Sequence, residues 1–280
     1  MSTATTGPRQ GLEARGATLR YPHGPTITAD LDLTIRPGGF TVIVGANACG
    51  KSTLLKALAR VLVPQDGTVL LDGVDAHAHP PKSFATRVGY LPQSAIAPDG
   101  ITVGELVARG RYPHQTMLRQ WSAADRRAVD AALDRTRLDD LVDRPVAALS
   151  GGQRQRVWIA MALAQQTEIL LLDEPTTFLD LAHQVDVLEL CHELNTAGGT
   201  TVVAVLHDLN QACRYADEII VMKGGAVTAI GAPDEVITAD VVHDAFGLDV
   251  RVIEDPVTGT PLVLPLTGPR RRTPTERTAP

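Results

Sequence analysis

The sequence has no hydrophobic run long enough to cross a membrane. Its apolar stretches all fall short of the roughly 18 residues that a spanning helix needs, although 44% of its 280 residues are hydrophobic. No apolar leader of the kind that directs secretion is recognised near Met1. We therefore expect a globular protein with a core large enough for two subdomains.

Cysteine is also scarce, and the charge balance is acidic. Three cysteines without a CxxC spacing exclude a disulfide framework and fit a reduced cytosol. A net charge of −6 gives no reason to expect nucleic-acid binding. Residues 1–10 and 266–280 are expected to be disordered tails. The second tail is basic, with four arginines among Pro and Thr, and contact with anionic lipid is the alternative for it.

A glycine-containing loop stands between a predicted strand at residues 40–45 and a predicted helix beginning near Lys51. Apolar residues recur after the loop at helical spacing, at Leu54, Leu55, Leu58, Val61 and Leu62. In this context backbone N–H groups and the helix dipole bind phosphate, Lys51 reaches the β- and γ-phosphates, and Ser52 binds Mg²⁺. The alternative is a glycine loop without a ligand. The predicted ATP-binding residues here are Gly45, Ala46, Asn47, Ala48, Cys49, Gly50, Lys51, Ser52 and Thr53.

Two carboxylates close a second apolar run, at residues 169–172. A buried strand that ends in two acids places them at the carboxyl edge of the sheet, where α/β folds bind ligands. Asp173 then suits Mg²⁺, which prefers hard oxygen ligands. Glu174 is placed to act as the general base on the attacking water. The alternative is that both acids only cap the next element.

A second glycine-rich segment, residues 149–153, precedes another helical pattern. One nucleotide does not need two phosphate cradles from the same chain. The economical arrangement is a head-to-tail dimer, in which each chain covers its partner's ATP. The residues assigned to this role in trans are Ser150, Gly151, Gly152 and Gln153. The alternative is an N-cap without a ligand.

These motifs together resemble the ATPases of ABC transporters, over about residues 11–265. The resemblance implies an α/β fold: a P-loop NTPase (RecA-like) core, an N-terminal antiparallel β subdomain, and an inserted α-helical signature subdomain at about residues 94–160. It makes the loop around Lys51 the Walker A motif, residues 149–153 the signature and residues 169–174 the Walker B motif. Ala46 and Ala48 depart from the family, and Ala48 lacks the easy access to positive φ that Gly provides.

The same resemblance carries over further roles, position by position. Tyr21 corresponds to the aromatic that stacks on adenine. Gln93 corresponds to a glutamine that contacts Mg²⁺ and the attacking water and senses the membrane subunit. Asp180 lies in the loop that couples the two sites, and His207 corresponds to the histidine on the γ-phosphate. The implied catalytic set is Lys51, Gln93, Glu174 and His207, with Ser52, Gln93 and Asp173 at Mg²⁺.

Longer segments are similar to the ATPases of iron-siderophore importers, namely residues 108–114, 177–184, 205–210 and 255–265. Heme and cobalamin importers have close relatives of these segments. The implied partners are a second copy of the chain, transmembrane permease subunits and, indirectly, an extracytoplasmic siderophore-binding protein. The implied location is the cytoplasmic face of the membrane, and the implied cofactors are ATP and Mg²⁺.

Two other protein classes and one local alternative stand beside this interpretation. A soluble ABC ATPase usually carries two cassettes or a long coiled-coil insertion, and this chain has neither. A P-loop kinase or GTPase is opposed by the signature segment. Locally, residues 109–117 are expected to border the groove for the membrane subunit, but an ordinary solvated face is an equally weighted interpretation of Arg109, Arg111 and His114.

Overall fold

The computed structural model describes residues 11–116, 121–177 and 179–266. A small antiparallel sheet is formed near the amino terminus, with strand order β2-β1-β4-β5. Its strands are β1 (Leu12–Arg20), β2 (Thr26–Thr34), β4 (Asp66–Leu71) and β5 (Val74–Asp75). Apolar side chains of β1 and β2 alternate with exposed ones, so one face of this sheet packs on the core while the other meets solvent.

A larger sheet forms the centre of the molecule, with strand order β10-β9-β3-β8-β7-β6. Its strands are β3 (Phe40–Gly45), β6 (Val88–Leu91), β7 (Ile169–Asp173), β8 (Thr201–Val205), β9 (Glu218–Lys223) and β10 (Ala226–Gly231). All neighbours pair in parallel except β10, which is antiparallel to β9. Every residue of β3, β7 and β8 is buried, as expected for parallel strands covered on both faces.

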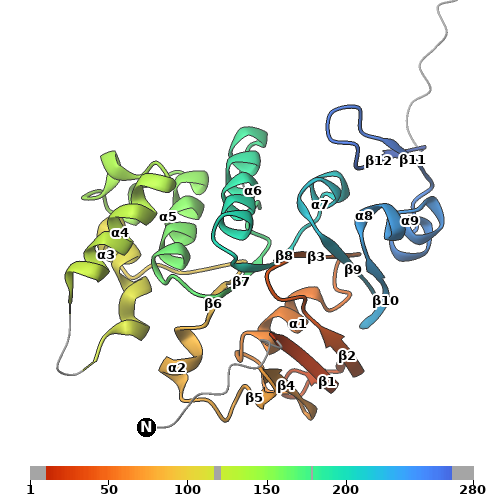
Figure 1. Cartoon of the computed structure of the whole chain (residues 1–280), viewed down its shortest axis with the longest axis horizontal. Coiled ribbons are helices and arrows are strands. Elements are labelled where there is room, and N and C mark those ends of the chain that lie inside the picture. Colours follow the sequence, from red (N-terminus) through yellow and green to blue (C-terminus); the bar gives the residue numbers. More distant parts are fainter. Residues whose placement is uncertain (1–10, 117–120, 178, 267–280) are drawn as a thin grey trace, which may run out of the picture.

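The helices lie in three groups around this sheet (Figure 1). On one face is α1 (Lys51–Leu58), together with the antiparallel sheet; on the other are α6 (Leu181–Thr196) and α7 (Leu209–Tyr215). Two separate hydrophobic clusters fill the two faces, one with Ile43 and Leu171, the other with Val42 and Leu172. The alternation along each strand therefore divides one apolar run between two cores.

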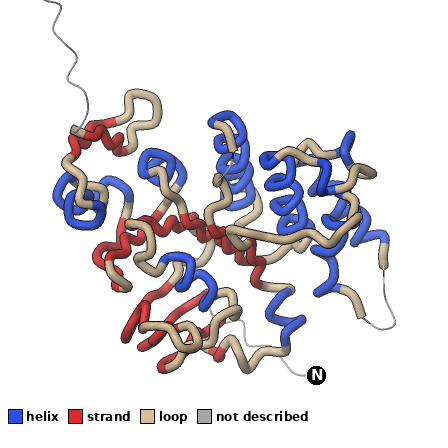
Figure 2. The backbone as a smooth tube through the Cα atoms, turned by 180° about the vertical axis from the view of Figure 1, so that it is seen from behind, coloured by secondary structure: helices blue, strands red, loops and turns tan. Residues whose placement is uncertain are grey.

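The third group of helices stands beyond the β6 end of the sheet (Figures 1 and 2). It contains α3 (Val103–Ala108), the 3-10 segment η1 (Arg109–His114), α4 (Ala123–Arg135), the short turns η2 (Asp139–Leu141) and η3 (Val146–Ala148), and α5 (Gly151–Ala164). The remaining elements are α2 (Pro81–Ala85), α8 (Pro233–Val236), α9 (Ala239–Phe246), and the hairpin of β11 (Val250–Glu254) and β12 (Pro261–Pro265).

The structure confirms the predicted fold class and corrects one helix. The helix beginning at Lys51 ends at Leu58. The apolar spacing wrongly predicts that Val61 and Leu62 also belong to it. Arg60 adopts φ 61°, which breaks the helix, and Val61 is 61% exposed. Of the predicted tails at 1–10 and 266–280, residues 1–10 and 267–280 lie outside the described residues, whereas the Leu266 N–H donates to the Asp249 carbonyl oxygen at 2.9 Å. Within the described ranges, no helix is both long and apolar enough to cross a membrane.

Candidate functional site

The loop between β3 and α1 is held in a shape that only part of its sequence could predict. Gly45 has φ 151°, and a Cβ there would lie 2.2 Å from the Met222 carbonyl oxygen, so this position requires glycine. Gly50 has φ 106° and begins α1. Ala48, the doubtful position, adopts φ 61°. The loop therefore takes up a left-handed residue without glycine, at a cost of about 1 kcal/mol.

Lys51 is buried and lies across this loop. It is 5% exposed, and its Nζ donates to the carbonyl oxygens of Gly45 at 2.8 Å and Ala46 at 3.0 Å. The ammonium is thereby held inside the ring of loop backbone that a phosphate would face. Cys49 is also only 5% exposed, and its Sγ lies 3.9 Å from the Lys51 Nζ. Its thiol is packed under the loop.

Two of the predicted Mg²⁺ ligands meet although they are far apart in the sequence. Ser52 Oγ donates to Asp173 Oδ1 at 2.7 Å, which joins the start of α1 to the end of β7. Asp173 is 1% exposed. Burial raises the pKa of Asp173, the charge of Glu174 acts in the same direction, and the Ser52 hydroxyl opposes both. A buried carboxylate and a hydroxyl at one point are hard oxygen donors, so these residues fit Mg²⁺.

Glu174 is the centre of a second polar cluster. Its Oε2 accepts from Gln93 Nε2 at 2.7 Å and from Thr177 Oγ1 at 3.1 Å, and its Oε1 lies 2.7 Å from His207 Nε2. The backbone of Glu174 has φ 53°, a strained conformation of the kind that clusters at functional sites. The arrangement fixes the carboxylate at the carboxyl edge of the sheet and leaves the side chain of His207 47% exposed.

Sequence reasoning did not assign Thr177 to the site. The signal was present, because Thr177 follows Glu174 by three residues and its N–H donates back to the Glu174 carbonyl at 3.2 Å, closing a turn. In the sequence, Thr177 stands out only as the first residue of the segment 177–184, which is similar to iron-siderophore importers. Ile27, on β2, was also missed, and only the folded chain places it near the loop.

A cavity of about 570 Å³ joins the two clusters. Its lining brings together residues from the phosphate loop, β2 and the ends of β6, β7 and β8, namely Ile27, Asn47, Ala48, Cys49, Gly50, Lys51, Ser52, Thr53, Gln93, Glu174 and His207. Lys51, Gln93, Glu174 and His207, predicted to be catalytic, thus face one space. Such a cavity at the carboxyl ends of parallel strands is where this type of fold binds ligands.

The signature residues do not line this cavity in the described part of the chain. Ser150 caps α5. Its side chain accepts from the Gln153 N–H, and the side-chain oxygen of Gln153 accepts from the Ser150 N–H. Both Ser150 and Gly151 are exposed. A Cβ at Gly151 would meet nothing within 4 Å. The start of α5 is therefore open at Gly151, where the helix backbone faces away from the rest of this chain.

Asp180 and Tyr21 also lie off the cavity lining. Asp180 caps α6 by accepting from the His183 N–H at 3.0 Å, and this bond lowers the pKa of its carboxyl. Tyr21 is 37% exposed, and its hydroxyl accepts from Lys56 Nζ on α1 at 3.2 Å. The roles of both residues toward ATP stay predictions.

For Arg111, both interpretations of the segment after α3 are wrong. This residue is neither on a solvated face nor available to a groove, because it is 5% exposed and paired with Asp125 at 2.9 Å. His114 is half-buried, with Nε2 2.7 Å from the Gln165 carbonyl oxygen. Arg109 is exposed, as either interpretation required. Met117, the last residue of that segment, lies outside the described residues.

The fold and the site together define a P-loop nucleotide hydrolase with an inserted helical group. The sequence profile of the ABC transporter family matches residues 28–177. The chain is 52% identical over 253 residues to the ferric enterobactin transport ATP-binding protein FepC of Escherichia coli (strain K12), covering 90% of this chain and 93% of that protein. The protein belongs to the ABC transporter family of ATP-binding proteins.

Two solved structures agree with this assignment. One is a chain from the inward-facing conformation of a protein described as a metal-chelate type ABC transporter, with a TM-score of 0.77, 27% identity, and 92% of this chain and 97% of that chain covered. The other is the dimeric structure of the bacterial ABC transporter cassette MJ0796, with a TM-score of 0.71, 28% identity, and 79% and 98% covered. ABC cassettes form dimers and bind ATP.

Proposed function

We propose that this chain hydrolyses Mg²⁺-ATP to drive the uptake of a ferric siderophore through partner permease subunits. It acts as a head-to-tail pair on the cytoplasmic face of the membrane and receives its cargo through the permease from an extracytoplasmic binding protein. The observation that carries the substrate class is the 52% identity to a ferric enterobactin transport ATPase, which spans 90% of this chain and 93% of that protein.

The geometry supports a division of labour at the phosphates. The buried ammonium of Lys51 and the loop N–H groups bind the β- and γ-phosphates, while Ser52 and Asp173 hold Mg²⁺. When bound, Mg²⁺ supplies charge neutralisation at the phosphate oxygens. Glu174 accepts the proton of the attacking water at its carboxylate. Gln93 and His207 keep that carboxylate in place, because each has a nitrogen 2.7 Å from one of its oxygens.

The signature completes the proposed site from the partner chain. In one chain Ser150 and Gly151 are exposed and outside the cavity. A second copy related head to tail would present these N–H groups to the γ-phosphate. Asp180, at the start of α6, then lies in the connection between the two sites, and the ring of Tyr21 is assigned to the adenine.

A deletion strain tests the proposed substrate. Loss of the gene should abolish energy-dependent uptake of a ⁵⁵Fe-labelled siderophore and leave binding at the cell surface intact. Wild-type protein should restore uptake, whereas Glu174→Gln should not. Normal uptake of every ferric siderophore with lost uptake of heme or cobalamin would overturn the siderophore assignment and keep the importer. Unchanged uptake of all of them would favour a soluble ATPase.

A further inference from the structure

Arg111 makes an extensive set of buried contacts outside the ATP site. Its Nε donates to Asp125 Oδ1 at 2.9 Å. Its Nη1 donates to the Ala164 carbonyl oxygen at 2.7 Å and to Gln166 Oε1 at 3.1 Å. The side chains of Arg111 and Asp125 are 6% and 7% exposed. One guanidinium thereby joins three segments: η1, the first turn of α4 and the end of α5.

Two helix ends meet at Arg111. Each has beside it a side chain whose charge is opposite in sign to the helix dipole there. Ala164 is the last residue of α5, where carbonyl groups lack partners within the helix and the dipole is negative. Asp125 lies in the first turn of α4, where the dipole is positive, and it also completes a capping box with Ser122. The planar fork of Arg, with N–H donors in fixed directions, serves a carboxylate and a helix carbonyl together. Lysine would keep the charge and lose this geometry.

The backbone of η1 also packs directly against the backbone of α5. A Cβ on Gly110 would lie 2.2 Å from the Met161 carbonyl oxygen, so the two backbones touch. His114 Nε2, four residues further, lies 2.7 Å from the Gln165 carbonyl oxygen. The segment and the last turn of α5 are therefore one mechanical unit. The outer side of η1 is accessible, because Arg109 and Tyr112 are exposed.

The opposite end of α5 carries the signature and contacts the catalytic loop. With 14 residues, the helix is about 21 Å long, and Ser150 caps its first turn. Gln155, in the next turn, donates its Nε2 to the Pro175 carbonyl oxygen at 3.1 Å. Pro175 directly follows Glu174. A displacement of α5 as a rigid rod would therefore move the signature and the loop that positions the proposed base.

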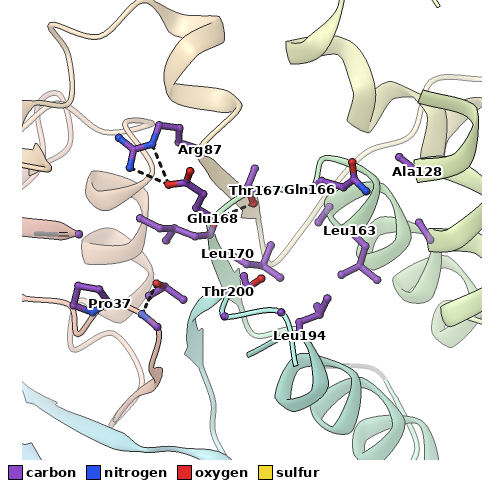
Figure 3. Close-up of a pocket in the computed structure, with 18 of the residues that line it drawn as sticks. Pro37, Arg87, Ala128, Leu163, Gln166, Thr167, Glu168, Leu170, Leu194 and Thr200 are labelled. Atoms are coloured by element: carbon purple, nitrogen blue, oxygen red, sulfur yellow. Dashed lines mark hydrogen bonds and ion pairs between the residues drawn. The ribbon is translucent and has the colours of Figure 1, made fainter. Parts of the chain in front are cut away.

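Part of the helical group faces the core across a space at the amino end of the sheet. A cavity of about 490 Å³ lies there, with walls from α4, α5, α6 and the starts of β7 and β8. Figure 3 shows Ala128, Leu163 and Gln166 on one side of it, and Arg87 and Glu168, which form an ion pair, on the other. Gln166 is the residue that also accepts from Arg111. The clamp that Arg111 forms with Asp125, Ala164 and Gln166 thus lies on the helical side of this cavity.

From these contacts we infer that Arg111 is a positioning residue that couples η1 to the signature. It locks η1, α4 and α5 into one body, so that force on the exposed side of η1 reaches both Ser150 and the Glu174 loop through α5. This inference rests on the proposed function in one respect: the permease is taken to press on η1. Arg111 does not line the cavity proposed to bind ATP, so its effect is on coupling and not on the hydrolysis step.

The experiment compares variants in the complete transporter, reconstituted with its permease subunits in liposomes. Arg111→Lys keeps the charge, and Arg109→Lys, on the exposed side of the same segment, is the matched control. Basal hydrolysis by the isolated Arg111→Lys chain should stay close to wild type. Ferric-siderophore uptake per ATP hydrolysed should fall by roughly 5- to 150-fold, the usual range of coupling between two sites. Arg109→Lys should keep both values near wild type.

The result that overturns the inference is a proportional loss of uptake and hydrolysis, or no loss of either. Thermal denaturation of each variant is measured beside the assay. If Arg111→Lys does not fold, Gln166→Asn decides instead. It removes one acceptor, retains the Arg111–Asp125 pair and tolerates the φ of 52° at this position. It should show a smaller uncoupling, and wild-type coupling would contradict the inference.

Failure of the proposed substrate is recognised separately. If the wild-type complex hydrolyses ATP but transports no ferric siderophore, the proposed function fails while the clamp stays testable. The readout is then the stimulation of hydrolysis by the permease subunits in detergent. Arg111→Lys should lose most of that stimulation at normal basal rate, and full stimulation would contradict the inference.

Discussion

Two carboxylates in this molecule have similar numbers of hydrogen-bond donors and opposite consequences. Asp125 accepts from the N–H and hydroxyl of Ser122 and from the guanidinium of Arg111. Glu174 is bonded by an amide and a hydroxyl, with an imidazole at 2.7 Å. Among the described residues, no Lys or Arg side chain bonds to Glu174.

The two carboxylates differ in whether a guanidinium lies beside them and in whether they face a cavity. The Ser122 hydroxyl, with the guanidinium of Arg111 beside it, lowers the pKa of Asp125, so this carboxylate is a weak base and serves structure. The carboxylate of Glu174 is fixed by hydrogen bonds without a Lys or Arg partner among the described residues, and it faces a cavity. Similar hydrogen bonding therefore builds a clamp in one place and positions the proposed base in the other. The predictions below separate the two.

The largest effect is expected at Glu174. Glu174→Gln keeps the shape and removes the base, so ATP turnover should fall by about 10²- to 10⁴-fold while Mg²⁺-ATP affinity stays near wild type. Phosphate release and calorimetric titration measure the two quantities. Asp173→Asn is the contrasting variant and should weaken Mg²⁺-ATP binding itself. Near-normal turnover by Glu174→Gln would remove this residue from the role of base.

Asp125 should show its effect in folding instead. Asp125→Ala leaves the buried Arg111 cation without its carboxylate, which should lower the free energy of unfolding by about 3 kcal/mol. Asp186→Ala is the control, because Asp186 pairs with Arg137 where both side chains are exposed, and such pairs contribute only about 0–1 kcal/mol. Urea denaturation measures both. Equal losses would show that burial does not distinguish the two pairs.

The stability difference between wild type and Asp125→Ala should depend on pH. The pKa of Asp125 is lowered in the folded state, so its contribution is present above the unfolded pKa of about 3.9. It is lost as the pH falls through the lower folded value, because protonation removes the ion pair. Denaturation curves at several pH values should therefore converge in acid. A constant difference down to low pH would contradict the assigned cause.

The smallest effect is expected in the phosphate loop. Ala48 adopts φ 61°, and glycine occupies this region without steric cost, so Ala48→Gly should raise the stability of the folded chain by about 1 kcal/mol. ATP affinity should change little, because the loop already has the required path. Thermal denaturation with and without Mg²⁺-ATP checks this. A loss of stability would mean that the alanine methyl packs favourably where it lies.

Much of the ATP site could be predicted because its chemistry is local in sequence. Lys51 and Ser52 come after β3 and its loop, Asp173 and Glu174 stand at the end of β7, and the carboxyl ends of parallel strands meet at one edge. The residues that contact Glu174 were harder to predict from the sequence. Gln93 and His207 come from other strand ends, and only a resemblance assigned them.

What escaped prediction depends on contacts between distant segments. The burial of Arg111 could not be inferred from its neighbours, because its acceptors are Asp125 and the far end of α5. Periodicity extended α1 to Val61 and Leu62, but the backbone of Arg60 turns left-handed and ends it. Hydrophobic spacing indicates which residues face a core, and it does not contain the φ value that stops a helix.

The central claim is that one chain supplies the base and its partner supplies the signature. Size exclusion with light scattering of Glu174→Gln, alone and combined with Gly151→Glu, tests it most directly. A side chain at Gly151 meets nothing in one chain, so the double variant should fold normally. We expect an ATP-dependent dimer for Glu174→Gln and a monomer for the double variant. A double variant that dimerises equally well with ATP would contradict it.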